Sequence, residues 1–171
     1  MNSTQFKNRT YVVFVSLVAA WCGGILIAPA LAGRFPLLSH ALYAFYAPIC
    51  HQLDVRSFHL FGASFAVCIR CSSIYFTFLL SLLALPLFRR VASLTYPSTK
   101  WVALAMVPMA VDVFLDVAGL HTSSALTREI TGVLFGAILP LYLVPPLLEG
   151  VSQLRDQFHA RGGSLYARKA Q

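Results

Sequence analysis

Residues 11–32, YVVFVSLVAAWCGGILIAPALA, contain no charged side chain. The hydrocarbon core of a bilayer is about 30 Å thick, and a helix rising about 1.5 Å per residue needs roughly 20 apolar residues to cross it. The stretch meets this length, and basic residues flank it, with Lys7 and Arg9 before it and Arg34 after it. It is therefore predicted to be a membrane-spanning helix.

A secretory signal is the alternative interpretation of the same stretch. It follows a basic start, and Ala30-Leu31-Ala32 resembles a small-residue cleavage site. However, the apolar run is longer than the roughly 7–15 residues of a signal core. We therefore expect residues 11–32 to stay in the protein as an anchor; cleavage would leave three spans.

Three further apolar stretches predict membrane-spanning helices at about residues 63–88, 101–120 and 130–148. Residues 33–62 form a predicted loop with a short interfacial helix, because aromatic residues with polar tips are favoured at that depth. Residues 149–171 form a polar tail. The chain is thus predicted to be a single all-α membrane domain with about four transmembrane helices.

The composition supports a membrane protein. Hydrophobic residues make up 58% of the chain and charged residues 11%, against about 25% charged in a typical soluble domain. The net charge of +7 does not indicate nucleic acid, because the basic residues lie between and beyond the apolar runs rather than in one patch. The lipid bilayer is the expected partner, and the sequence leaves open a homo-oligomer or another membrane protein.

The distribution of lysine and arginine predicts the orientation. With four spans, nine basic residues fall on the side that holds both termini and four fall on the other side. Because cytoplasmic segments carry the excess of Lys and Arg, both termini are expected in the cytoplasm. The predicted location is the inner (plasma) membrane, with residues 33–62 on the extracytoplasmic face.

Charged side chains gather at the predicted extracytoplasmic ends of the helices. A charge inside a membrane is costly unless it is paired or hydrated. We expect Arg70 to pair with Asp112 or Asp116, and Arg128 with Asp116 or Glu129. The predicted ion-pair layer comprises Arg56, Arg70, Asp112, Asp116, Arg128 and Glu129. It could form a polar cavity or simply hold the helices together.

A C-x-x-C motif, Cys68-Ile69-Arg70-Cys71, opens the second predicted span. Residues three apart on a helix share a face, so both sulfurs point the same way. A zinc site combines two such thiolates with two further ligands, which the preceding loop or His121 could supply. The predicted metal ligands are Cys50, His51, Cys68 and Cys71, with His59 or His121 as substitutes for His51. Zinc or another transition metal is the predicted cofactor.

Two other functions remain compatible with the cysteines. A thiol–disulfide oxidoreductase linked to a quinone also uses C-x-x-C, and Arg70 would favour the reactive thiolate. Such an enzyme needs a second cysteine pair, whereas only Cys50 remains outside the motif and Cys22 lies within the first span. Alternatively, the cysteines pack as small apolar residues in a non-catalytic membrane subunit or assembly factor. Whether the protein is an enzyme stays open.

Several ordered motifs resemble those of a family of small prokaryotic membrane proteins of unknown function. They are Cys50-His51-Gln52, Arg56-Ser57-Phe58, Cys68-x-Arg70-Cys71 with Ile74-Tyr75, Asp112, and Arg128-x-x-Thr131-Gly132. The resemblance covers about residues 48–136. This chain departs from the family pattern at Val113, where glycine is expected, at Asp116, where an amide is expected, and at Ser72-Ser73, where glycine tends to occur. The resemblance implies the fold and the site but names no reaction.

Overall fold

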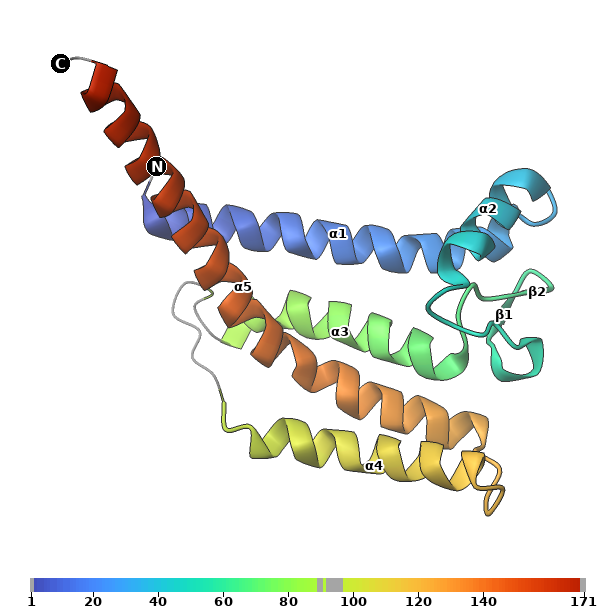
Figure 1. The fold of residues 1–171 in the computed structure, drawn as a ribbon. Coiled ribbons are helices and arrows are strands. Elements are labelled where there is room, and N and C mark those ends of the chain that lie inside the picture. Colours follow the sequence, from blue (N-terminus) through green and yellow to red (C-terminus); the bar gives the residue numbers. More distant parts are fainter. Residues whose placement is uncertain (1, 89–90, 92–96, 170–171) are drawn as a thin grey trace.

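The computed structural model describes residues 2–88, 91 and 97–169. These residues are mostly helical, which confirms the predicted all-α class. The elements are α1 (Ser3–Leu31), α2 (Pro36–Tyr46), η1 (Asp54–Arg56), β1 (His59–Leu60), β2 (Ala63–Ser64), α3 (Ile69–Phe88), α4 (Lys100–Val117) and α5 (Ala125–Lys169). Figure 1 shows α1, α3, α4 and α5 as a bundle, with α2, η1 and the strands at one end. We call this the loop end.

Three helices in the described part of the chain are long and apolar enough to cross a membrane. They are α1, α3 and the Ala125–Phe158 portion of α5. The predicted span at residues 101–120 corresponds to α4, which has 18 residues and includes Lys100, Asp112 and Asp116. α4 carries these three charges and is not among the three helices above, but it still packs along α5 (Figure 1). The short extra helix predicted near Pro36 is α2.

The second long helix begins later than predicted, at Ile69 instead of residue 63. The intervening residues Ala63–Ser64 pair with His59–Leu60 in an antiparallel hairpin. The two residues at its tip, Phe61 and Gly62, have φ values of +53° and +82°. Two positive φ values are typical of a tight two-residue hairpin turn. Because residues 59–64 form this hairpin, they are not part of α3.

α5 continues through the residues predicted to form a polar tail. It runs without interruption to Lys169, although Pro140, Pro145 and Pro146 lie inside it. Polar composition alone does not end a helix, and residues 149–169 contain no proline. The tail is therefore an extension of the last spanning helix, which projects past the bundle in Figure 1.

Two glycines allow α5 to approach α3 closely. A Cβ added at Gly132 would lie 2.8 Å from the carbonyl oxygen of Arg70, and one at Gly136 would lie 2.5 Å from that of Ile74. Helices in membranes associate through such small-x-x-x-small surfaces because lipid offers no hydrophobic drive for association. This contact fixes the position of α3 along α5 and its rotation about its own axis. Arg70 and Cys71, at the start of α3, are positioned by it.

The loop end is fastened to α1 by hydrogen bonds from α2. The buried Tyr46 hydroxyl donates to the carbonyl oxygen of Trp21 at 2.7 Å. The Ser39 hydroxyl donates to the carbonyl oxygen of Ala28, also at 2.7 Å. The Tyr46 ring packs edge-on against the Trp21 ring, with centroids 5.0 Å apart. These contacts hold the end of α2, and therefore the loop that follows it, over the end of α1.

Adjacent glycines in α1 provide a test of this fastening. A Cβ at Gly24 would overlap the Tyr46 hydroxyl, whereas a Cβ at Gly23 would meet nothing within 4 Å. We expect Gly24→Ala to destabilise the protein by about 1–3 kcal/mol through overpacking. Gly23→Ala should be neutral or stabilise it by up to about 1 kcal/mol, because alanine is the better helix former. Thermal unfolding in detergent compares the two; equal effects would contradict the proposed α1–α2 contact.

Candidate functional site

Three of the four cysteines meet at the loop end. The sulfur atoms of Cys50, Cys68 and Cys71 all lie within 4.8 Å of one another. Cys50 follows the end of α2, where its backbone N–H donates to the carbonyl oxygen of Tyr46 at 3.1 Å. Cys68 precedes α3 and Cys71 lies in its first turn. The structure therefore brings the C-x-x-C motif together with a third sulfur from a separate segment.

The surroundings of Cys50 favour its thiolate form. The backbone N–H of Cys68 donates to the sulfur of Cys50 at 3.1 Å. Hydrogen bonds from the Cys68 and Cys71 side chains, and from the backbone N–H groups of Cys68 and Gln52, lower the pKa of the Cys50 thiol well below its usual value. Because the thiolate is the form that binds metals, Cys50 has the donor chemistry of a metal ligand.

Gln52 shapes the loop that carries Cys50. Its side-chain amide donates to the carbonyl oxygens of Tyr43 at 2.7 Å and of Ala66 at 2.8 Å. Its backbone has a φ of +50°, which turns the chain sharply after the cysteine. Gln52 thus ties α2 to the segment before α3 and sets the distance between Cys50 and Cys68. Its place in the Cys-His-Gln motif was the signal for this role, which sequence reasoning did not assign.

The predicted histidine ligands lie apart from the sulfur cluster. His51 is exposed and lines the same cavity as the cysteines, but no histidine among the described residues belongs to the group of neighbouring sulfurs. His59 contacts Asp54 at 3.0 Å on the surface of the loop. His121 is exposed in the connection between α4 and α5.

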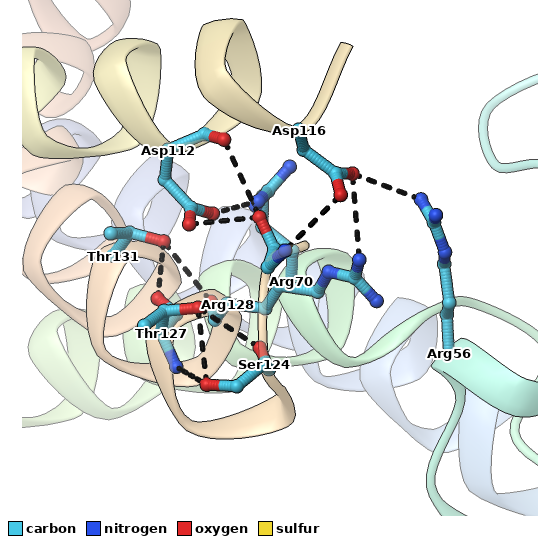
Figure 2. Close-up of polar contacts among 9 residues, drawn as sticks. Arg56, Arg70, Asp112, Asp116, Ser124, Thr127, Arg128 and Thr131 are labelled. Carbon is cyan, nitrogen blue, oxygen red and sulfur yellow. Dashed lines mark hydrogen bonds and ion pairs between the residues drawn. The ribbon is translucent and has the colours of Figure 1, made fainter. Parts of the chain in front are cut away.

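Five of the six residues predicted for the ion-pair layer meet in one network (Figure 2). Arg70 pairs with Asp112. One carboxylate oxygen of Asp116 accepts from Arg56 at 3.1 Å and contacts Arg128 at 3.5 Å. The layer therefore links the loop, α3, α4 and α5. Glu129 was also predicted to belong to it, but Glu129 is exposed and has no ion pair within the described residues.

Ser123 is a further member of the layer that sequence reasoning missed. Its hydroxyl donates to Asp112 at 2.8 Å, and its backbone N–H donates to Asp116 at 3.1 Å. It lies in the turn that reverses the chain between α4 and α5. The turn thereby orients both carboxylates toward the arginines. A serine in a loop carries no spacing signal that would have indicated this contact.

Removing Asp112 tests how tightly the layer holds the bundle. The side chains of Arg70 and Asp112 are 18% and 9% exposed, so Asp112→Ala would leave a largely buried guanidinium without its carboxylate. We expect a loss of about 3–5 kcal/mol in the free energy of unfolding. The control is Asp54→Ala, because the Asp54 carboxylate is 72% exposed and exposed pairs contribute about 0–1 kcal/mol. Denaturant unfolding in detergent measures both; equal losses would contradict a structural role for the Arg70–Asp112 pair.

The cysteines and the arginines share one cavity. Its volume is about 330 Å³. Its walls include the three clustered cysteines, together with Arg56, Arg70 and Arg128. A metal held by the sulfurs would therefore face a space lined by positive charge.

Comparisons with known proteins agree with this description. Residues 50–142 match a family described as predicted membrane protein (DUF2085). The chain is also 37% identical over 149 residues to an uncharacterised protein of Methanocaldococcus jannaschii, an alignment that covers 84% of this chain and 95% of that protein. No solved structure matches. The family match begins at Cys50 and includes the three clustered cysteines and the ion-pair layer; the chain belongs to the DUF2085 family of predicted membrane proteins.

Proposed function

We propose that this membrane protein binds a transition-metal ion, zinc foremost, through the thiolates of Cys50, Cys68 and Cys71. The observation that carries the proposal is the convergence of three sulfurs from two segments of the chain. Zn–S bonds are about 2.3 Å long in a tetrahedral site, so bound sulfurs lie roughly 3.8 Å apart. Sulfurs within 4.8 Å of one another are close to that arrangement.

The ligand set contains three thiolates and one further position. Structural zinc sites fill all four positions with protein ligands, whereas sites that act on other molecules keep one position open. His51 lines the same cavity and is the candidate for a fourth protein ligand if its ring turns toward the sulfurs. With His51 bound the site would be structural; with the position open it would handle a ligand from the cavity.

The proposed site lies at the extracytoplasmic face of the plasma membrane, with both termini in the cytoplasm. The excess of basic residues on the side of the termini supports this orientation. The packing of α1 against α2, α3 and α5 supports a retained anchor over a cleaved signal. A reporter enzyme that is active only in the cytoplasm tests the orientation when it is fused to the C-terminus; an inactive fusion would contradict it.

A quinone-linked thiol oxidoreductase is the second candidate. It is favoured by an apolar groove that begins about one helical turn along α3 from Cys71. The groove, about 400 Å³, lies between α1, α3 and α5 and includes Trp21 and Tyr75 in its wall. Tyr75 is one helical turn from Cys71. Two thiols would form a disulfide and pass two electrons and two protons to the quinone. Cys22 is not one of these two thiols, because it lies outside the group of clustered sulfurs. Its thiol instead donates to the carbonyl oxygen of Tyr75 at 3.5 Å.

Metal content per chain tests the proposal and separates the candidates. Protein purified in neutral detergent without chelators should carry about one zinc or other transition-metal ion per chain. Cys68→Ser should lose the metal, whereas Cys22→Ser should keep it, because Cys22 lies outside the cluster. Metal-free wild-type protein whose cysteines alternate between reduced and oxidised forms would favour the oxidoreductase. Metal-free protein whose function survives replacement of all three clustered cysteines would favour a non-catalytic subunit that works with a membrane partner or as an oligomer.

A further inference from the structure

The cavity beside the sulfur cluster combines three arginines from three different elements. Arg56 comes from η1 in the loop, Arg70 from α3 and Arg128 from α5. Figure 2 shows Arg56 reaching from the loop toward the same Asp116 carboxylate that Arg128 contacts. Arginines from distant segments converge here without an equal number of carboxylates.

The charges of this group do not balance. The ion pairs that the structure gives these three guanidinium groups involve two carboxylates, Asp112 and Asp116. Both carboxylates also accept hydrogen bonds from Ser123, so part of their acceptor capacity is taken. These five residues together carry one net positive charge, and the three arginines among them line the cavity.

The arginines also retain hydrogen-bond donors. A guanidinium has five N–H groups in a planar fork. Arg56 uses one of its nitrogens on Asp116, and its side chain is 44% exposed. Arg128 contacts the same oxygen at 3.5 Å, at the limit of a hydrogen bond. The buried Nε of Arg70 has no partner. The two carboxylates thus leave much of the donor capacity of the group unused.

We propose that this cavity binds a phosphate-type oxyanion through Arg56 and Arg128. Guanidinium forks match the oxygens of phosphate, and groups of arginines are favoured where phosphate is recognised. Ligand cavities range from about 300 to 1,000 Å³, so a volume of about 330 Å³ suits a small anion or a lipid headgroup. The proposal goes beyond metal binding and does not depend on it, because these contacts come from the arginines.

The phosphate group has two sources, and the test includes one arm for each. In the first arm, inorganic phosphate is titrated into protein in neutral detergent, with chloride replaced to hold the ionic strength constant. In the second arm, phosphatidylglycerol replaces part of the detergent, and inorganic phosphate is added as a competitor. Both arms use metal-loaded protein and protein with its metal removed. Calorimetry records saturable binding.

Arg56 is the most informative residue to replace. Its side chain is exposed in the loop, so its replacement should not disturb folding. Arg56→Gln should weaken binding about tenfold, by removing a charge-assisted hydrogen bond. The matched control is Arg34→Gln, which removes the same charge from an exposed position outside the cavity and should leave binding unchanged. Thermal unfolding of each variant confirms that it is folded.

The outcomes separate the sources and the two proposals. Saturable binding of inorganic phosphate that depends on Arg56 identifies a free anion, and binding of phosphatidylglycerol that depends on Arg56 identifies a headgroup; either supports the proposal. No saturable binding in either arm overturns it, as does equal weakening by Arg56→Gln and Arg34→Gln. Because anion binding is measured with and without metal, these results can be interpreted even if the protein binds no metal.

Discussion

If Cys50, Cys68 and Cys71 hold a metal ion as proposed, its removal should lower the stability of the protein more than any single surface substitution. Metal binding to thiolates contributes folding free energy directly, and structural zinc contributes about 10–16 kcal/mol in small peptides at neutral pH. Cys50 lies in the loop end and Cys71 in α3, so an ion bound by all three cysteines would connect the two, and its loss would release that connection. We expect a strong chelator to lower the midpoint of thermal unfolding in detergent, and added zinc to restore it.

A variant that lacks a ligand provides the control for this experiment. Cys71→Ser should unfold at a lower temperature than the wild type before any chelator is added, and the chelator should change it little. Cys22→Ser should respond to the chelator as the wild type does, because its sulfur lies outside the cluster. Equal responses of the wild type and Cys71→Ser would mean that the chelator acts elsewhere.

Replacing Gly136 should separate α3 from α5. A leucine there would place its Cβ 2.5 Å from the carbonyl oxygen and 3.0 Å from the Cα of Ile74, both of which are backbone atoms. A backbone cannot move aside as a flexible side chain does, so the helices must shift. Overpacking typically costs about 1–3 kcal/mol and occasionally more, and we expect Gly136→Leu to lie at or above the upper end.

The matched control lies on the same helix. A Cβ at Gly150 would meet nothing within 4 Å, so Gly150→Leu adds the same side chain without the contact. It should be neutral or slightly stabilising because leucine is a better helix former than glycine. Unfolding free energies in detergent compare the two variants. A Gly136→Leu protein as stable as Gly150→Leu would show that α3 and α5 do not meet through this glycine.

The long apolar runs made most of the fold predictable. Residues 11–32 and 72–88 lack charge, and apart from Ala32 they lie within α1 and α3. The start of α3 was less predictable, because Ala63 and Ser64 continue the apolar stretch in the sequence but lie in a strand. Their pairing with His59–Leu60 depends on contacts between segments, which local composition does not reveal. The extension of α5 was missed because a polar helix has no apolar periodicity to mark it.

The sulfur donors of the candidate site could be predicted from the sequence. The position of His51 and the choice of ion-pair partners could not. The spacing of Cys68 and Cys71 on a helix predicts two neighbouring sulfurs, and the predicted topology adds Cys50 from the preceding loop. The position of His51 depends on the turn at Gln52, whose amide binds two carbonyl groups that are distant in sequence. No spacing rule describes that turn. The sequence left two candidate carboxylates for Arg70 and two for Arg128. The packing of α4 pairs Arg70 with Asp112 and Arg128 with Asp116.

X-ray absorption at the zinc edge of wild-type protein, purified without chelators, shows whether Cys50, Cys68 and Cys71 hold a metal ion. The proposed site predicts a zinc ion with three sulfur neighbours at about 2.3 Å and one nitrogen or oxygen neighbour at about 2.0–2.2 Å. The lighter neighbour would be His51 or an oxygen from the cavity. A zinc ion without sulfur neighbours would contradict metal binding by these cysteines. Protein that lacks zinc or another transition metal and has two of the clustered cysteines joined in a disulfide would also contradict it.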